Sequence, residues 1–486
     1  MKINSFRDPD GRVYINDKHV LRIVTEKGVP FYYEFFTSDF SQKLIAEQRL
    51  INTNILDKHQ ADSLLEQDED FRDYFNSDSQ HNKGLIVEHE KVPFISYPYE
   101  WPIEMLYAAG ILTIDIAVES DEYNLGIKDA SPYNVLFRGT NPIFIDVLSF
   151  EKREQGDYTW LAYAQFIRMF YLPLLVNKYF GISIADSLLN HRDGLEPDDV
   201  YQLCSFTQKI LPPFLTMISI PKWLANSKKA KNEELYHKKM MSNHEKTKFI
   251  YQSLLNRLKK SLMKLLPEND RKSVWSDYMQ VNNNYLPEQI SAKSDFIKQF
   301  LQEYNPQRVL DIGCNTGYFT FLAARHGASV VAIDYDPVVV GRVWQQAYEE
   351  KLDILPLHVN ITRPTPSMGW GNTEYLSFIE RAEGYFDTVF MLAVIHHLLV
   401  SERIPLEKIV DLAAKLTTKY LVVEYVDPED SMFKILTRGR EELYNYLTPE
   451  IFIEACQRQF DIVDSMLISG SKRCLYILCK KGNSNG

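Results

Sequence analysis

The feature that most constrains this chain is a buried strand that runs into a glycine-rich turn and then opens a helix. The segment Val309-Leu-Asp-Ile-Gly-Cys-Asn-Thr-Gly317 begins with the apolar run of such a strand. Gly313 allows a tight turn and the close approach of a ligand, and Gly317 allows the following helix to pack closely. Because doubly wound sheets bind ligands at the carboxyl ends of their strands, the segment predicts a ligand site at this turn.

Helix and strand patterns alternate around this turn as far as the C-terminus. Helices are expected at residues 291–303, 319–326, 338–351, 405–416 and 448–459, and strands at 308–311, 329–334, 354–358, 386–393, 420–425, 460–469 and 474–480. Such alternation predicts an α/β fold, with a doubly wound Rossmann-like sheet that carries helices on both faces. The last two strands, joined by Ser469-Gly-Ser-Lys472, predict a terminal antiparallel hairpin.

Two carboxylates frame the expected site. Asp311 precedes the first glycine, where it would repel a pyrophosphate but suits a cofactor with a cationic amino group and a sulfonium. Asp334 ends the next strand, where a carboxylate can accept both hydroxyls of a ribose. The turn lacks the Gly-x-Gly-x-x-Gly pattern of dinucleotide sites.

The turn and Asp334 resemble the first motif and the ribose-binding acid of class I S-adenosylmethionine-dependent methyltransferases. Residues 386–397 resemble the fourth strand of those enzymes and the turn after it, and the resemblance extends over about residues 291–481. It implies S-adenosylmethionine as the cofactor and no metal. The implied cofactor-binding residues are Asp311, Gly313, Cys314, Asn315, Gly317, Asp334 and Asn360. Asn360 stands where these enzymes often carry an Asp near the adenine.

Three side chains near the expected methyl position are candidate catalytic bases. His396 and His397 follow the fourth strand, and an unperturbed imidazole with a pKa of about 6.5 can take up a proton at neutral pH. Glu424 ends the fifth strand. The alternative for each is a packing or turn role, since a base is needed only if the acceptor is protonated at pH 7.

Loops beyond the sheet are candidates for binding the methyl acceptor. Between the third and fourth strands, a loop rich in Pro and Gly contains the residues that we expect to face the substrate, Trp370, Asn372 and Glu374. After the fifth strand comes a second loop on the acceptor side, with Arg438-Gly-Arg440, Glu441 and Tyr444. Ahead of the domain, three aromatic residues form either a lid or a packed interface: Trp275, Tyr278 and Tyr285.

The first 220 residues predict an α+β domain of another kind. Strands are expected at 12–15, 19–24, 85–87 and 92–97, a polar loop at 56–84, and helices at 102–118 and through 157–220. Asp129 and Asn134 are five residues apart, and Asp146 ends an apolar strand. In phosphoryl transfer an Asp orients the acceptor hydroxyl, while an Asn and a second Asp hold magnesium.

These three residues resemble the catalytic loop and metal-binding strand of protein-kinase-like and aminoglycoside-phosphotransferase-like proteins, over about residues 85–180. The sequence departs from that pattern, because it has no N-terminal glycine-rich phosphate loop, Ile127 replaces a His, and Val147-Leu148 replaces Phe-Gly. The resemblance therefore implies a degenerate kinase-like domain that binds a substrate or partner. An active phosphotransferase and an unrelated helix-rich accessory domain are the alternatives.

The order of the two halves resembles a bacterial family of class I methyltransferases that includes nodulation-associated proteins. We expect a kinase-like domain at 1–220, a basic helical linker at 221–290 and the methyltransferase domain at 291–486. Residues 222–272 carry 14 Lys or Arg against five Asp or Glu. This charge indicates either a solvated linker face or a docking surface for an acidic partner or RNA.

Charge and composition narrow the acceptor and the compartment. The net charge of −11 disfavours a protein that coats nucleic acid, so we expect a small-molecule, glycan-precursor or peptide acceptor. The alternatives are an RNA methyltransferase that uses the basic linker, a bifunctional phosphotransferase, and a non-enzymatic scaffold. Five scattered cysteines favour a reducing, cytoplasmic compartment, and polar residues within 160–180 argue for a buried helix over a membrane span. The sequence leaves the acceptor and the oligomeric state open.

Overall fold

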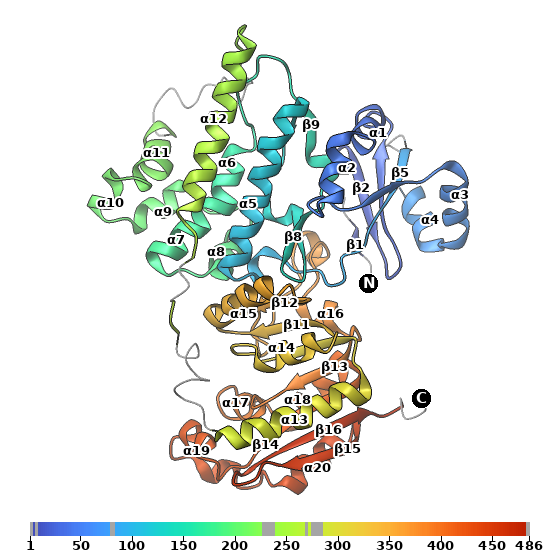
Figure 1. Cartoon of the computed structure of the whole chain (residues 1–486), viewed down its shortest axis with the longest axis vertical. Coiled ribbons are helices and arrows are strands. Elements are labelled where there is room, and N and C mark those ends of the chain that lie inside the picture. Colours follow the sequence, from blue (N-terminus) through green and yellow to red (C-terminus); the bar gives the residue numbers. More distant parts are fainter. Residues whose placement is uncertain are drawn as a thin grey trace. The chain divides into compact units, whose positions relative to one another are not determined.

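The chain divides into two compact units. The computed structural model describes residues 3–4, 8–77, 83–225, 239–267, 271–273 and 285–482. The first unit comprises residues 1–267 with 368–375, and the second comprises 268–367 with 376–486. This division differs from the expected separate linker at 221–290, because α12 (His244–Met263) packs on α5 (Ile103–Ser120) inside the first unit (Figure 1). An apolar stripe at helical spacing, from Tyr251 to Leu262, is buried in that contact, as a solvated linker would not be.

A seven-stranded mixed sheet forms the centre of the second unit. In spatial order its strands are β12 (Ile354–His358), β11 (Ser329–Asp334), β10 (Arg308–Ile312), β13 (Phe386–Met391), β14 (Thr417–Val426), β16 (Arg473–Lys480) and β15 (Phe460–Leu467). The first five are parallel, whereas β16 pairs antiparallel with both β14 and β15. The expected Rossmann-like sheet with a terminal antiparallel hairpin is confirmed.

Helices cover the sheet of the second unit (Figure 1). They are α13 (Pro287–Tyr304), α14 (Tyr318–Arg325), α15 (Pro337–Glu350), α16 (Phe378–Ala382), α17 (Ile395–Val400), α18 (Leu406–Leu416), α19 (Ser431–Thr437) and α20 (Pro449–Gln457). One apolar core joins α13, α14 and α15 to the sheet and includes Val422 of β14. Successive residues of a strand point to opposite faces, so Leu421 and Val423 serve the other face, where α18 packs on β13 and β14.

The strand order places a switch point beside β10. The chain passes from β10 to β11 on one side, and the later strand β13 lies on the other side of β10. Ligands of doubly wound sheets bind where the strand order reverses in this way, in the crevice outside the carboxyl ends of the strands. The glycine-rich turn after β10 lies at that point.

The first unit begins with a five-stranded antiparallel sheet in the order β1 (Ile3–Asn4), β2 (Gly11–Ile15), β3 (Val20–Thr25), β5 (Lys83–His89) and β4 (Thr53–Ile55). Between β3 and β4 the chain forms α1 (Val29–Phe36) and α2 (Asp39–Ala46). The strands expected at 12–15, 19–24 and 85–87 correspond to β2, β3 and β5.

Two expectations for this region are wrong. The polar segment 56–84 contains α3 (Lys58–Gln67) and α4 (Glu69–Asn76), which begin at capping residues Asp57 and Asp68. Phe71 of α4 is fully buried against the sheet, and that apolar contact supports a helix that is otherwise polar. Residues 92–97 form no strand; they are a largely buried irregular segment, bent at Pro93 and Phe94, that leads into a short helical turn at Pro98–Glu100.

The rest of the first unit is mainly helical. Two short hairpin-like sheets pair β6 (Leu125–Ile127) with β9 (Phe150–Lys152) and β7 (Val135–Arg138) with β8 (Asn141–Phe144). The further helices are α6 (Tyr163–Phe166), α7 (Leu172–Phe180), α8 (Ile184–Asn190), α9 (Pro197–Leu203), α10 (Phe206–Ile210) and α11 (Ile220–Ala225). In the part of the chain that is described, no helix has both the length and the apolar character needed to cross a membrane.

Candidate functional site

A cavity of about 320 Å³ opens at the carboxyl ends of β10, β11, β12 and β13. This volume lies within the range of about 300–1,000 Å³ that is typical of small-molecule sites. The cavity is lined by Ile312, Gly313, Asn315, Ile333, Asp334, Tyr335, Val359, Asn360, Ile361, Thr362, Leu392, Ala393, Val394, His397, Leu398, Ser401 and Glu402. Most of these residues end a strand or follow one directly, so the edge of the sheet itself forms the cavity.

The turn after β10 requires glycine at two positions. Gly313 has a φ of +75°, and a Cβ atom there would lie 2.3 Å from the Val394 side chain. Gly317 has a φ of +83°, and a Cβ atom there would collide with Phe321 and Val343. The first glycine therefore lets the turn pass close to the loop after β13, and the second lets α14 pack against the core.

Asp334 is a buried carboxylate that lines the cavity. It ends β11, is only 8% exposed, and accepts hydrogen bonds from the backbone N–H groups of Asn315 and Asp336, each at 3.0 Å. Burial is the main cause that raises its pKa to about 6, against the opposing effect of these backbone bonds. The carboxylate thus fixes the glycine-rich turn to β11 and still faces the cavity.

Asp311 is buried one strand away and does not line the cavity. Its carboxylate accepts a hydrogen bond of 2.5 Å from the Thr320 hydroxyl of α14. Burial raises the pKa of Asp311 to about 6, and the nearby charge of Asp334 adds to the increase. The two carboxylates therefore lie close enough to sense each other, but only Asp334 opens onto the cavity.

The two candidate histidines are both held neutral. Burial lowers the pKa of His396 well below its ordinary value, and its Nδ1 is buried without a hydrogen-bond partner in the described structure. Burial, with the charge of Arg473, lowers the pKa of His397 to about 4. His397 lines the cavity, whereas His396 does not.

Glu424 lies in a buried network of charges. It is fully buried, accepts a hydrogen bond from the Tyr285 hydroxyl, and pairs with the Lys293 ammonium of α13. Arg473 of β16 donates to Tyr285 and forms a two-point ion pair with Asp430, at 2.9 and 3.0 Å. Each oxygen of Glu424 therefore has a partner. Because Lys293 belongs to α13 and Glu424 to β14, their ion pair joins this helix to the sheet.

The structure separates the residues predicted for the cofactor into two groups. Those that line the cavity are Gly313, Asn315, Asp334 and Asn360, and those that lie behind its wall are Asp311, Cys314 and Gly317. Cys314 is buried, which raises the pKa of its thiol well above the ordinary value. The Asn360 side-chain oxygen accepts hydrogen bonds from the backbone and hydroxyl of Thr362, at 3.0 and 2.7 Å.

The residues expected to face the substrate do not line this cavity. Residues 368–375 group with the first unit rather than with the sheet on which the cavity lies. Trp370 is 74% exposed, and Glu374 accepts a hydrogen bond from the Trp370 backbone N–H within the same loop. Trp275 and Tyr278, the other lid candidates, lie outside the described residues.

Several cavity residues were missed by sequence reasoning. Tyr335 directly follows Asp334, and Ala393 adopts a left-handed φ of +56° in the turn after β13. Both residues could have been predicted from their positions, because residues just beyond the ends of adjacent parallel strands meet at one edge of the sheet. Ser401 and Glu402, at the end of α17, could not be predicted in this way.

A second acidic cluster lies in the first unit. The three kinase-like candidates are close together: Asn134 donates to the Asp129 carbonyl and to Ser149, each at 3.1 Å, and Ser149 donates to Asp146 at 2.5 Å. Burial raises the pKa of Asp129, and the charge of Asp146 adds to the increase. Gln165 donates to the Asp129 carboxylate at 2.6 Å.

A cation from the N-terminal sheet pairs with one acid of this cluster. Arg22 of β3 forms an ion pair with Asp146 at 2.8 Å and donates to His89 at 3.2 Å. Among the described residues, no group of three or more His, Cys, Asp or Glu is arranged to hold a metal ion.

Comparison with known proteins gives a domain match and a relative that spans most of the chain. A family model described as a methyltransferase domain matches residues 255–459. The chain is 28% identical over 477 residues to nodulation protein NoeA of Rhizobium meliloti (strain 1021). This match covers 97% of the present chain and 94% of NoeA.

Two solved methyltransferases resemble part of the chain. The N-methyltransferase NodS of Bradyrhizobium japonicum WM9, in complex with S-adenosylhomocysteine, is 17% identical and covers 41% of this chain and 91% of its own, with a TM-score of 0.31. Magnesium protoporphyrin IX methyltransferase of Synechocystis PCC 6803 is 18% identical, with a TM-score of 0.30. That match covers 42% of the present chain and 97% of the other enzyme.

The matched domain model agrees with the geometry of the site. The turn after β10, the buried acid that ends β11 and the cavity between them lie within the matched residues. The chain therefore carries an S-adenosylmethionine-dependent methyltransferase domain within residues 255–459.

Proposed function

We propose that the cavity at the end of β10 and β11 binds the methyl donor, with Asp334 accepting the ribose hydroxyls. The observation that carries this proposal is the Asp334 carboxylate, which is positioned by two backbone N–H groups and faces a cavity of suitable size. The turn at Gly313 and Asn315 would contact the methionine part. Asn360 would contact the adenine, with its amide nitrogen as donor.

The residues present suit this donor. A sulfonium and an ammonium are cations, and the nearby carboxylates of Asp311 and Asp334 provide the opposite charge. The exposed ring of Tyr335 follows Asp334 and offers a flat surface for a nucleoside. When bound, S-adenosylmethionine supplies an electrophilic methyl group.

The catalytic contribution of the chain is positioning and exclusion of water, not a titrating base. His397 lines the cavity, but burial lowers its pKa to about 4, so its imidazole is a weak proton acceptor, and Glu424 has no oxygen without a partner. Holding two reactants in the correct geometry can supply much of the rate of a transfer reaction. The acceptor in this proposal is a small molecule, a glycan precursor or a peptide whose reacting atom has its lone pair available.

Titration calorimetry of the full chain with S-adenosylmethionine tests the donor site. Asp334→Asn should weaken binding by about 1–3 kcal/mol, roughly 5- to 160-fold, since the amide keeps only one acceptor oxygen for the ribose and carries no charge. Asp387→Asn is a control away from the cavity, because Asp387 also accepts two backbone N–H groups, from Gln307 and Arg308, through one of its oxygens at the amino end of β13. Equal affinity in wild type and Asp334→Asn would reject the assignment.

We also propose that the first unit is a degenerate kinase-like domain that acts as a scaffold. Asp129, Asn134 and Asp146 come together as the resemblance requires, yet Asp146 is already paired with Arg22. A magnesium ion would have to compete with the Arg22 guanidinium for Asp146, and the two positive charges would then repel each other. Calorimetry with magnesium-ATP should give no saturable binding to the wild-type chain; binding that Asp146→Ala abolishes would instead favour a phosphotransferase.

A further inference from the structure

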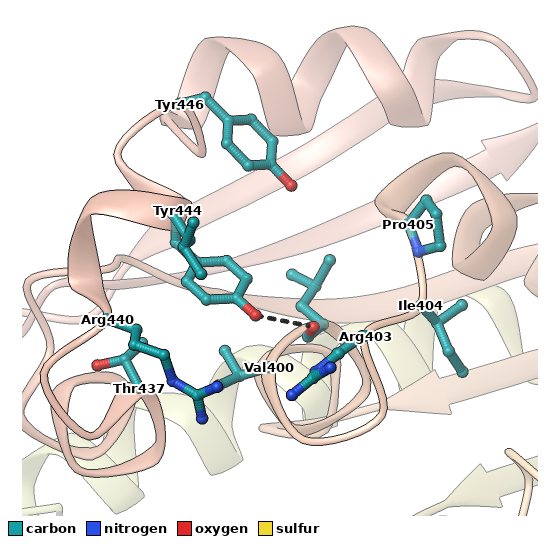
Figure 2. A pocket seen from close by; sticks show the side chains of 10 residues that line it. Val400, Arg403, Ile404, Pro405, Thr437, Arg440, Tyr444 and Tyr446 are labelled. Atoms are coloured by element: carbon teal, nitrogen blue, oxygen red, sulfur yellow. Dashed lines mark hydrogen bonds between the residues drawn. The ribbon is translucent and has the colours of Figure 1, made fainter.

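A second cavity in the second unit lies against the other side of α17. It has a volume of about 410 Å³ and is formed by α17, the loop that follows it, and the segment after α19. Its lining is Leu399, Val400, Arg403, Ile404, Pro405, Thr437, Arg440, Leu443, Tyr444 and Tyr446. Figure 2 shows the side chains of Arg403 and Arg440 on either side of Val400, with the Tyr444 ring beside them.

The two arginines of this cavity have no acidic partner in the described structure. Neither guanidinium has an ion pair or a side-chain hydrogen bond among the described residues, whereas Arg325, Arg363 and Arg473 of the same unit each form an ion pair. Arg403 also holds a left-handed φ of +56°, a conformation that costs free energy at a residue with a side chain. Both arginines are exposed, and two like charges that line one cavity favour an anion as their ligand.

The rest of the lining suits an organic group attached to that anion. Ile404, Pro405 and Leu443 are apolar, and Tyr446 is 55% exposed. Tyr444 is held in place by a hydrogen bond of 3.4 Å from its hydroxyl to the Leu399 carbonyl (Figure 2). A guanidinium binds phosphate through two parallel N–H groups. Two guanidinium groups carry two positive charges, which match the double negative charge of a phosphate monoester better than they match the single charge of a carboxylate.

We infer that this second cavity binds a phosphate monoester carried by the methyl acceptor. The inference rests on the proposed donor site, because α17 is a wall of both cavities. His397 and Leu398 face the donor cavity, while Leu399 and Val400, one residue further on, face the second. The anchoring phosphate is therefore separated from the methyl-accepting atom by about the 10 Å width of a helix, so it is a recognition group and is not itself methylated.

Calorimetry with phenyl phosphate, benzoate and phenol on the full chain tests this anion site. Wild type should bind phenyl phosphate more tightly than benzoate and should not bind phenol. Arg403→Gln/Arg440→Gln should weaken phenyl phosphate binding at least tenfold, and Arg403→Lys/Arg440→Lys should restore part of it. Arg458→Gln is the matched control, since Arg458 is an exposed arginine of the same unit outside the cavity.

The same variants separate this inference from the proposed donor site. The Gln double variant should bind S-adenosylmethionine as wild type does, which also shows that it is folded. Phenyl phosphate affinity that is unchanged in the Gln double variant, or benzoate that binds as tightly as phenyl phosphate, overturns the inference. A wild-type chain that binds phenyl phosphate through these arginines but does not bind S-adenosylmethionine would overturn the donor site and leave the anion site standing.

Discussion

The two units place an Asp near the end of a strand in opposite situations. Asp334 of the second unit is held by backbone N–H groups and faces a cavity, so its charge is available to a ligand. Asp146 of the first unit is paired with Arg22 and accepts from Ser149. The comparison teaches that two acids in similar places along a strand differ in whether a cation of the protein already neutralises them.

The largest expected effect is on stability, and it should appear at Asp146. The side chains of Arg22 and Asp146 are 9% and 19% exposed, so Asp146→Ala leaves a largely buried guanidinium without its partner. Breaking such a pair costs about 3 kcal/mol or more. Urea unfolding followed by circular dichroism should show this loss for the first unit, with unchanged affinity for S-adenosylmethionine.

The double replacement Arg22→Met/Asp146→Leu sharpens that result. It removes both charges and should recover most of the lost stability, because a buried ion pair contributes little net free energy over apolar residues of similar size. If Asp146→Ala alone were as stable as wild type, the pair would not neutralise the cluster and the contrast with Asp334 would fail.

Ligands should stabilise the two units unequally. A donor present at 100 times its Kd raises the free energy of unfolding of the unit that binds it by about 2.7 kcal/mol. We expect S-adenosylmethionine to raise the unfolding temperature of the second unit and magnesium-ATP to leave that of the first unchanged. Differential scanning calorimetry resolves both; an upward shift with magnesium-ATP would mean that Arg22 yields to the nucleotide.

Donor affinity should depend on pH between 5 and 7. Burial raises the pKa of Asp334 to about 6, so lowering the pH from 7 to 5 protonates it and reduces its ionised fraction about tenfold. The affinity for S-adenosylmethionine should fall by about that factor, and in Asp334→Asn the remaining pH dependence should be flatter. A profile in wild type that is flat across this range would contradict the role of the carboxylate.

The stability of the donor-free second unit should change in the opposite sense. In the unfolded chain Asp311 and Asp334 lose their protons near their ordinary pKa, whereas in the folded unit they keep them up to about pH 6. The folded state therefore binds more protons between about pH 4 and 6, and these groups reduce stability as the pH rises through that window. Above it their effect is constant.

The smallest expected effect is at His397. Because burial lowers its pKa to about 4, its NMR titration should show no inflection between pH 6 and 7, with His397→Gln used to assign the signal. An inflection near 6.5 would restore His397 as a candidate base.

The sequence predicted the second unit better than the first because long apolar strands and periodic helices define it locally. The expected strand 329–334 coincides with β11, and the neighbouring elements differ from expectation by a few residues at their ends. In the first unit, α3 and α4 were missed because they are polar along most of their length and Phe71 is their one fully buried side chain, with partly buried neighbours packed around it.

The site was predictable only where chain position alone determines it. Asp334 and the glycine turn belong to adjacent strand ends, so their meeting follows from a parallel sheet. The pairing of Arg22 with Asp146, and of Lys293 with Glu424, joins residues more than 100 positions apart and depends on tertiary packing that no local pattern encodes.

The buried link between Tyr285, Lys293 and Glu424 determines where the methyltransferase domain can be excised for separate expression. A fragment that begins at Ser291, where the sequence pattern places the start of the domain, would lack the tyrosine whose hydroxyl lies between Glu424 and Arg473. It would also lose the bond from Gln289 to the Ser469 carbonyl, which fastens the start of α13 to the terminal hairpin. Recombinant fragments should therefore begin ahead of Tyr285.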